Sequence, residues 1–276
     1  MTRLVQESPE NRLAALDNLP IYEAPLVGFA NGNDPLFAQY KEIIGPFHMT
    51  PQEALEGGLK NAPQAKDIDW DGLSVISWIL PISRRTRLSN RHRDTTPSVR
   101  WAHTRWYGEM FSDHTRREVV RLLKGHGYAA VAPALSPSFK TISLDSGPAS
   151  NWSERHVAYA AGLGTFSLSD GFITPKGIAM RCASVVTDLK LPPSPRPYKN
   201  HYANCLYYHD GSCGECIERC PAGAISGKGH DKIKCQDYQS QVIGYLKEYY
   251  GVGVHGCGLC QTSVPCEAQI PPKTLR

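Results

Sequence analysis

The sequence lacks the features of a membrane protein or an exported protein. No apolar run among the 276 residues approaches the roughly 18 residues that a membrane-spanning helix needs. Residues 1–6 contain no apolar signal stretch, and the pair Arg84-Arg85 lies too far inside the chain to be an export signal. The formal charge of only +4 points to neither nucleic acid nor membrane as a partner. We therefore expect a cytoplasmic protein that binds no membrane.

A second absence is the glycine-rich G-x-G-x-x-G motif, which would indicate a dinucleotide site. The chain does contain 41% hydrophobic residues, which is enough for a core, and nine cysteines. Eight of the cysteines fall between positions 205 and 266. Thiols that are clustered in this way fit a reducing compartment better than a disulfide-forming one. The ninth, Cys182, lies on an expected strand, and we interpret it as a buried core thiol.

The clustered cysteines have a spacing that is typical of iron–sulfur proteins. The run at 213–221 reads C-x2-C-x3-C-P and resembles the end of the bacterial ferredoxin motif C-x2-C-x2-C-x3-C-P. In that motif, the cysteine before the proline usually binds a second cluster. By analogy with two-cluster ferredoxins we expect two [4Fe-4S] clusters. One would be bound by Cys205, Cys213, Cys216 and Cys266, and the other by Cys220, Cys235, Cys257 and Cys260.

The pattern departs from the ferredoxin motif at one position, where the expected first cysteine is Asp210. Either a loop brings Cys205 back to this corner, or His209 or Asp210 is the ligand, or the corner is open. Zinc is the alternative for the whole region, because paired C-x2-C sequences also bind it. The gap between the pairs is longer than the roughly 15–20 residues usual for zinc. A disulfide framework is the other alternative.

Residue patterns predict an α/β (α+β) domain before the cysteines. Thr50 to Glu53 form a capping box with proline at the first helical position. Periodicity and turn residues predict strands over 74–80 and 128–134, helices over 111–124, 154–161 and 236–250, and a hairpin formed by 172–174 and 178–187. The proline-rich segment 192–197 predicts a stiff linker. We therefore expect domains of residues 1–197 and 198–276.

Residues 84–121 contain ten arginines and no lysine. We interpret them as a solvated face whose arginines form ion pairs with Asp94, Glu109, Asp113 and Glu118. An anion-binding cradle is an alternative, because the guanidinium group suits phosphate and carboxylate. Base stacking on the interleaved aromatic residues would extend that alternative to RNA. The arginines are at positions 84, 85, 87, 91, 93, 100, 105, 116, 117 and 121.

Four stretches, taken in order, resemble the superfamily of epoxyqueuosine reductases and reductive dehalogenases. They are LDSGP at 144–148, ER at 154–155 with AGLG at 161–164, FITP at 172–175 with Gly177, Arg181 and 185–191, and CPAGAI at 220–225. The resemblance implies a nitroreductase-like α/β sandwich that holds a corrinoid, cobalamin. It further implies a small ferredoxin-like domain whose clusters pass electrons to cobalt from an external donor, ferredoxin or flavodoxin.

The resemblance also implies site residues and shows departures. Asp145 would be the general acid, and Arg181, Gly162 and Gly164 would contact the corrinoid. Epoxyqueuosine reductases usually continue into a helical-repeat tail, whereas this chain ends at Arg276, so we expect a short member. Residues 165–168 replace the Trp or Glu and the basic residue that members tend to carry. The D-x-H-x-x-G motif is absent, so the sequence does not predict a histidine ligand below cobalt.

Three functions follow from these observations. The first is an iron–sulfur, cobalamin-dependent reductase that acts on a small organic substrate by chemistry like dehalogenation or epoxide reduction. The second is an electron-transfer protein that reduces a partner's cofactor, in which case Asp145 would be structural. The third is a tRNA-modifying epoxyqueuosine reductase, which we rank last because the charge is low and the tail is missing. A flavin in place of the corrinoid is a further alternative.

Overall fold

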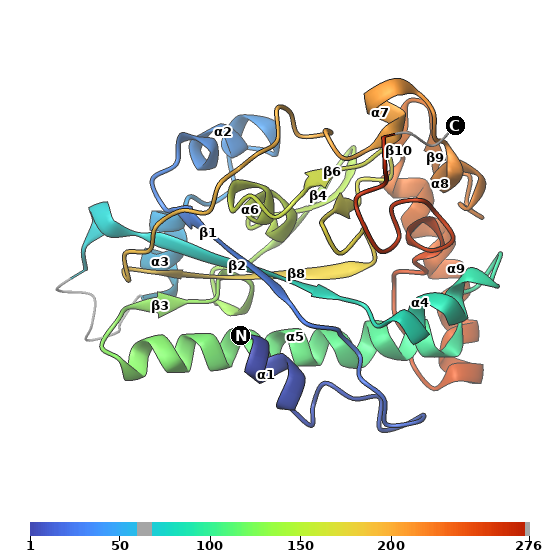
Figure 1. Cartoon of the computed structure of the whole chain (residues 1–276), viewed down its shortest axis with the longest axis horizontal. Helices are drawn as coiled ribbons and strands as arrows, with labels where there is room; N and C mark the ends of the chain where they lie inside the picture. The colour runs from blue at the N-terminus through green and yellow to red at the C-terminus, as the bar shows by residue number, and fades with distance from the viewer. Residues whose placement is uncertain (60–67, 274–276) are drawn as a thin grey trace.

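The computed structural model of the chain describes residues 1–59 and 68–273. At its centre is an antiparallel sheet of four strands in the order β1-β2-β8-β3 (Figure 1). These strands are β1 (Leu26–Asn31), β2 (Ser74–Pro81), β3 (Ala130–Val131) and β8 (Met180–Thr187). β2 and β8 pair over eight residues, from Ser74 opposite Thr187 to Pro81 opposite Met180. The expected α/β class is therefore confirmed.

Helices cover both faces of the sheet (Figure 1). One face packs against α2 (Pro35–Ile43), α3 (Pro51–Leu59) and α6 (Glu154–Ala160), and the other against α5 (Val99–Gly125). Because side chains alternate along a strand, Val75 and Ile79 of β2 join the first core, whereas Trp78 and Leu80 join the second. β2 is therefore apolar over most of its length, which made it recognisable in the sequence.

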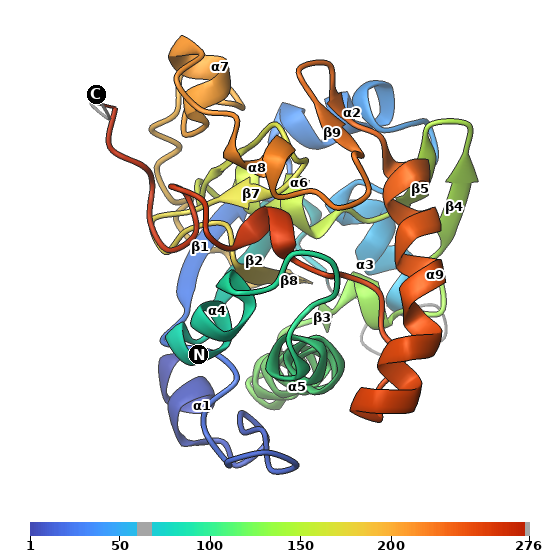
Figure 2. The same ribbon diagram turned by 90° about the vertical axis from the view of Figure 1, so that its right-hand side faces the viewer.

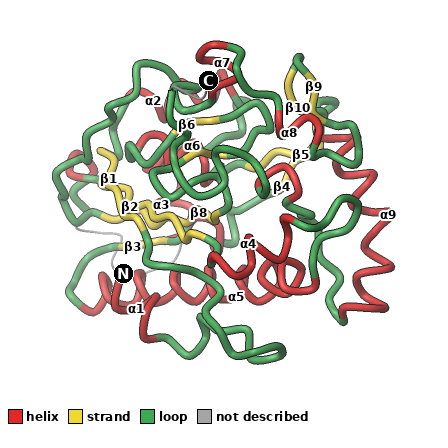
Figure 3. The backbone as a smooth tube through the Cα atoms, turned by 45° about the vertical axis from the view of Figure 1, so that its right-hand side comes forward, coloured by secondary structure: helices red, strands yellow, loops and turns green. Residues whose placement is uncertain are grey.

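The remaining elements, all short except α9, lie around this three-layer centre (Figure 3). The helices are α1 (Thr2–Glu7), α4 (Arg84–Arg91), α7 (Leu206–Asp210), α8 (Glu215–Glu218) and the long α9 (Lys232–Tyr250). Three two-stranded ribbons are formed by β4 (Thr141–Leu144) with β5 (Gly147–Ser150), β6 (Thr165–Phe166) with β7 (Phe172–Ile173), and β9 (Ile225–Ser226) with β10 (Gly229–His230). Single 3-10 turns occur at Trp70–Gly72, Pro133–Leu135 and Leu259–Gln261.

Local sequence signals fixed some helix ends well. At the start of α3, the Thr50 N–H donates to Glu53 Oε2 (2.8 Å) and the Glu53 N–H donates to Thr50 Oγ1 (3.3 Å), which confirms the capping box. α5 begins twelve residues before its predicted start, after Ser98, whose Oγ accepts the N–H of Trp101 (3.0 Å). The first part of α5 was missed because arginine and histidine interrupt its apolar period.

The predicted hairpin of 172–174 with 178–187 is wrong in its pairing. β7 pairs with β6, whereas β8 pairs with β2 and β3. Between the two predicted arms, the structure records the single bridge Thr174–Gly177. The reason is burial: β8 is buried at seven of its eight positions, which a central strand covered on both faces allows and an isolated hairpin does not.

The cysteine-containing part of the chain lies against α4 and α5 (Figure 2). The indole N–H of Trp101 donates to the carbonyl of Gly256 (2.9 Å), and Nε2 of His103 forms a hydrogen bond with the carbonyl of Tyr250 (2.8 Å). Asn90 is fully buried; its Nδ2 donates to the carbonyl of Cys257 and to Thr262 Oγ1, both at 3.2 Å. These contacts join the parts before and after residue 197 closely. The domain boundary at 197 stays a prediction.

The proline-rich segment runs extended beside β1, where the N–H of Ser194 donates to the carbonyl of Phe29 (2.8 Å) and the N–H of Phe29 donates to Ser194 Oγ (2.9 Å). In residues 1–59 and 68–273, no helix combines the length and apolarity needed to cross a membrane.

Candidate functional site

Five of the predicted cluster ligands line one small cavity. Cys205, Cys213, Cys216 and Cys266 line it together with Cys260, and its volume is about 30 Å³. The remaining wall is largely apolar and includes Leu168, Ile173, Ile178 and Val264. Burial raises the pKa of the Cys216 thiol to about 12, and the nearby Cys205 and Cys213 add to this rise. The sulfurs of one predicted set are therefore close neighbours.

The three candidates for the unusual corner differ in where they point. Cys205 is only 7% exposed and lines the thiol cavity. His209 and Asp210 instead pair with one another at 3.5 Å (Nδ1 to Oδ2), and each side chain is 37% exposed. Asp210 Oδ1 also accepts the N–H of Ser212 (2.9 Å) in the following turn. The geometry thus favours Cys205 over its two neighbours in the sequence.

The other four cysteines form a second group beside the first. Burial raises the pKa of the Cys257 thiol to about 11, and the charges of Cys235 and Cys220 raise it further. Burial likewise raises the pKa of Cys260, and among the neighbouring charges Cys257 adds most to the rise. Such thiols keep their protons near neutral pH unless a metal displaces them.

The donor set fits iron–sulfur chemistry, because thiolates are the soft ligands that such clusters and zinc select. In the described parts of the chain, no three His, Cys, Asp or Glu side chains are arranged to hold a metal ion.

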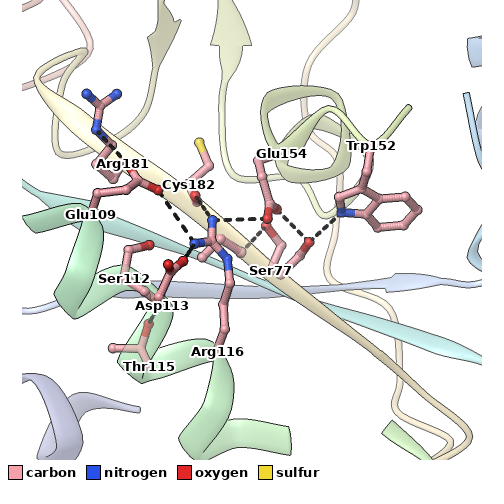
Figure 4. Close-up of polar contacts among 12 residues, drawn as sticks. Ser77, Glu109, Ser112, Asp113, Thr115, Arg116, Trp152, Glu154, Arg181 and Cys182 are labelled. Carbon is pink, nitrogen blue, oxygen red and sulfur yellow. Dashed lines mark hydrogen bonds and ion pairs between the residues drawn. The ribbon is translucent and has the colours of Figure 1, made fainter. Parts of the chain in front are cut away.

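A much larger cavity, of about 490 Å³, lies between α5, α6 and β8 (Figure 4). Its volume is typical of sites for small molecules and cofactors, which span roughly 300–1,000 Å³. Ile178 lines both this cavity and the thiol cavity, and Gln261, the neighbour of Cys260, lines the large one. The large cavity therefore adjoins the thiol groups. Apolar walls come from Leu135, Phe139, Phe172 and Met180.

A network of charges around the buried Arg116 forms the polar wall of the large cavity (Figure 4). The Arg116 side chain is 4% exposed; its Nη1 donates to Asp113 Oδ1 (2.7 Å) and its Nη2 to Glu154 Oε1 (3.2 Å). Glu109 Oε1 lies 3.7 Å from the same guanidinium. Burial raises the pKa of Glu154, although the charge of Arg116 opposes this rise. One arginine thus faces three carboxylates.

Glu154 is also linked to Trp152, which belongs to the core between the sheet and α2, α3 and α6. The hydroxyl of Ser184 donates to Glu154 Oε2 (2.5 Å), and the indole N–H of Trp152 donates to Ser184 Oγ (3.0 Å). The residue patterns had not placed Glu154 or Arg116 in a site. The available signals were the ER pair at 154–155 and the arginine-rich stretch.

The structure places the other predicted site residues in different environments. Arg181 lines the large cavity, with its Nε 3.9 Å from Glu109 Oε2. Cys182 is a buried core thiol as expected and also lines the cavity, and burial raises its pKa to about 12. Asp145 lies exposed in the turn between β4 and β5. The burial expected for a general acid is absent there, so that role stays a prediction.

The two glycines expected to contact a corrinoid pack against backbone instead. Gly162 has a φ of +74°, and a Cβ there would lie 2.2 Å from the carbonyl oxygen of Pro195. A Cβ on Gly164 would lie 2.3 Å from the carbonyl oxygen of Ile173. Both positions therefore need glycine for close chain packing, and neither is among the residues described as lining the large cavity.

The arginine-rich stretch is ion-paired, as expected, but not simply a solvated face. Glu109, Asp113 and Glu118 do pair with its arginines, whereas Asp94 pairs with Arg219 (3.5 Å). Arg87 and Arg116 are buried, which the sequence interpretation missed. Further partners come from distant parts of the chain, namely Asp17, Glu23, Glu154 and Glu267.

Comparison with known proteins gives relatives in one superfamily, although no family model matches the chain. An epoxyqueuosine reductase from Bacillus anthracis is 34% identical over 119 residues, which are 41% of this chain and 29% of that protein. A solved reductive dehalogenase aligns with a TM-score of 0.51 at 16% identity; its structure is said to suggest a mechanism for B12-dependent dehalogenation. It covers 89% of this chain and 30% of that one.

An epoxyqueuosine reductase solved with an epoxyqueuosine-modified tRNA-Tyr stem loop aligns with a TM-score of 0.40 at 21% identity, over 90% of this chain and 64% of that one. The chain spans less than a third of the length of the Bacillus anthracis relative. In its sequence and its α/β fold, the chain thus resembles the superfamily of epoxyqueuosine reductases and reductive dehalogenases, as its motifs predicted.

Proposed function

We propose that the chain is an iron–sulfur oxidoreductase in which two [4Fe-4S] clusters pass electrons into the 490 Å³ cavity. Cys205, Cys213, Cys216 and Cys266 would hold one cluster, and Cys220, Cys235, Cys257 and Cys260 the other. The observation that carries the proposal is the position of Ile178, which lines both the thiol cavity and the large cavity. A reducible group in the large cavity would therefore be separated from the first cluster by little more than this side chain.

The two thiol groups are also arranged in series. Cys260 belongs to the second group yet lines the cavity of the first. Arg219 holds the intervening loop, because its Nε lies 3.4 Å from the carbonyl of Leu259 and 3.1 Å from that of Thr262. Electrons would enter at the second cluster, pass to the first and leave across Ile178. Buried surroundings and hydrogen bonds of this kind set the potentials of such clusters.

We further propose that the large cavity binds a corrinoid, cobalamin, whose cobalt supplies the reducing centre when it is bound. Support comes from the dehalogenase relative, which is described as B12-dependent, and from the cavity itself. The apolar residues Phe139, Phe172 and Met180 suit the faces of a flat macrocycle. The charged groups of Arg181, Arg155 and Glu109 suit its polar rim. Bound there, the macrocycle would keep water from the substrate, a small organic molecule. A flavin is the alternative occupant.

The decisive experiment is metal analysis of protein purified without oxygen and reconstituted with iron, sulfide and cobalamin. We expect about eight iron atoms and eight sulfides per chain, with a broad visible absorption, together with one cobalt. Cys216→Ser and Cys266→Ser should each lose about half of the iron, whereas Cys182→Ser should keep all of it. Four or fewer iron atoms, or zinc in their place, would contradict the two-cluster proposal. Full iron without cobalt would favour an electron-transfer protein or a flavin enzyme.

A second candidate function is the reduction of epoxyqueuosine in tRNA. The specific support is the 34% identity to a protein named epoxyqueuosine reductase, over 41% of this chain. The low formal charge had placed tRNA last among the expected partners, and the relative's name gives it more weight. The test is tRNA binding as a function of salt, because contacts to several phosphates make affinity fall steeply as salt rises. Binding that is absent or independent of salt would remove this candidate.

A further inference from the structure

A separate cavity of about 340 Å³ opens beside the second thiol group. Cys235 lines it from the first turn of α9, together with His230, Lys232, Gln239 and His255. The side chain of Gln239 lies close to the cysteine, with its Nε2 2.9 Å from Cys235 Sγ. Cys235 is only partly buried. Cys235 is thus a predicted cluster ligand that lines this separate cavity and not the thiol cavity. α9 and the β9–β10 ribbon lie on this side of the molecule (Figure 2).

The chain next to this cavity is strongly basic. We call residues 228–234 the basic segment; it contains Lys228, Lys232 and Lys234 and the exposed side chain of Ile233, at 47%. Lys228 and Lys234 are exposed, and in the described part of the chain none of the three ammonium groups has a recorded hydrogen bond or ion pair.

Two acidic side chains in or near the segment also form hydrogen bonds. The carboxylate of Asp231 accepts the N–H of Lys234 (2.9 Å) as the cap of α9, and Asp170 Oδ2 lies 3.2 Å from His230 Nδ1. With three lysines and one aspartate, the basic segment nevertheless keeps a net positive charge. An exposed apolar side chain within a segment of net positive charge is the surface expected for an acidic protein partner.

We propose that the basic segment is the docking surface for an acidic one-electron carrier protein, which reduces the cluster bound through Cys235. The inference rests on the proposed function, because it needs a cluster at this position. In each encounter the carrier loses one electron, the cluster gains it, and no proton or group is transferred. The location suits this role, since Cys235 immediately follows the segment and the large cavity adjoins the other thiol group through Ile178.

RNA is the other macromolecule that a basic surface attracts, and the composition of the segment argues against it. Surfaces that bind single-stranded RNA combine cations with aromatic side chains on which bases stack. The one ring in residues 228–234 is that of His230, whose side chain is only 16% exposed and pairs with Asp170. Their apolar group is the aliphatic Ile233, which suits a protein surface better than a base.

The test is the rate at which the reconstituted protein's clusters are bleached by reduced flavodoxin, an acidic flavoprotein, in a stopped-flow instrument. The variant is Lys228→Glu/Lys234→Glu. The matched control is Arg117→Glu/Lys124→Glu, which reverses two exposed cations on the distal half of α5 (Figure 1). Photoreduced deazariboflavin, a small uncharged reductant, measures cluster integrity in every variant. Ile233→Asn removes the apolar centre without changing the charge.

We expect the segment variant to slow reduction by flavodoxin about tenfold or more at low salt, with the wild-type rate falling as salt rises. The control variant and all rates with deazariboflavin should stay within about twofold of wild type, and Ile233→Asn should weaken carrier affinity at any salt. Equal slowing by the control, or none by the segment variant, would overturn the inference. So would a segment variant that loses only tRNA binding. Protein without iron would instead overturn the proposed function and the inference with it.

Discussion

His48 should make the protein lose stability as the pH falls below about 6.5. The imidazole is fully buried, stacked on Trp152 at 6.0 Å, and its Nε2 accepts the N–H of Ser153 (3.1 Å). Since Nε2 is an acceptor, the folded protein holds this ring neutral. Burial is the largest cause that lowers its pKa, from the ordinary 6.5 to about 4, and the charge of Lys41 lowers it further.

The sign follows from proton binding. Below pH 6.5 the unfolded chain binds a proton at His48, whereas the folded protein does not until the pH approaches 4. The contribution of His48 to stability is therefore complete above pH 6.5 and is lost as the pH falls towards 4. A pKa difference of this size corresponds to about 3 kcal/mol of unfolding free energy. The loss should appear first at the start of α6, where Ser153 precedes Glu154 and the wall of the large cavity.

The assay is urea unfolding followed by tryptophan fluorescence at several pH values between 4.5 and 7.5. Wild type should lose most of this free energy across that range, and His48→Gln, which cannot be protonated, should lose about 3 kcal/mol less. His126→Gln is the matched control, because that ring is exposed at the end of α5. Changes in the clusters with pH affect all three proteins alike and cancel in the comparison. Parallel stability curves for wild type and His48→Gln would refute the reasoning.

Three further predictions concern the site and its support. Arg116→Met should cost about 3–5 kcal/mol of unfolding free energy, because it leaves three carboxylates beside the large cavity without their buried partner; Arg121→Met, which breaks an exposed pair with Glu118, should cost nothing measurable in the same urea titration. Ser184→Ala should cost about 1–3 kcal/mol, since it removes the hydroxyl between Trp152 and Glu154, and a loss below the error of chemical unfolding would contradict that bridge. Cys205→Ser should lower the iron content of reconstituted protein by about half, whereas His209→Ala and Asp210→Asn should leave it unchanged; the opposite pattern would move the ligand to the exposed pair.

The sequence predicted what depends on neighbouring residues and failed where distant segments decide. The spacing of Cys213, Cys216 and Cys220 within one short run indicated the thiol groups, and the capping box at Thr50 fixed a helix start. β8 was recognised as a strand, but its partner β2 lies about a hundred residues earlier, so the local hairpin was preferred wrongly. No periodicity reveals such a partner, because antiparallel pairing is set by the burial of the whole sheet.

The candidate site shows the same limit. Arg116 and Glu154 come from different helices, and only the fold brings them within 3.2 Å. Gly162 and Gly164 appeared in a motif and suggested contact with a cofactor, whereas their lack of a side chain is needed for the close approach of Pro195 and Ile173. A motif marks a position that matters; it does not say whether a ligand or the chain itself occupies the neighbouring space.

The buried amide of Asn90 has a consequence for assembly. Its Oδ1 accepts the N–H of Ser98, the residue that caps α5, while its Nδ2 donates to the carbonyl of Cys257. Metal that binds only the native arrangement of thiols shifts the folding equilibrium of everything joined to it. Loading iron should thus slow hydrogen exchange at the first turn of α5, and stripping it with a chelator should release that turn.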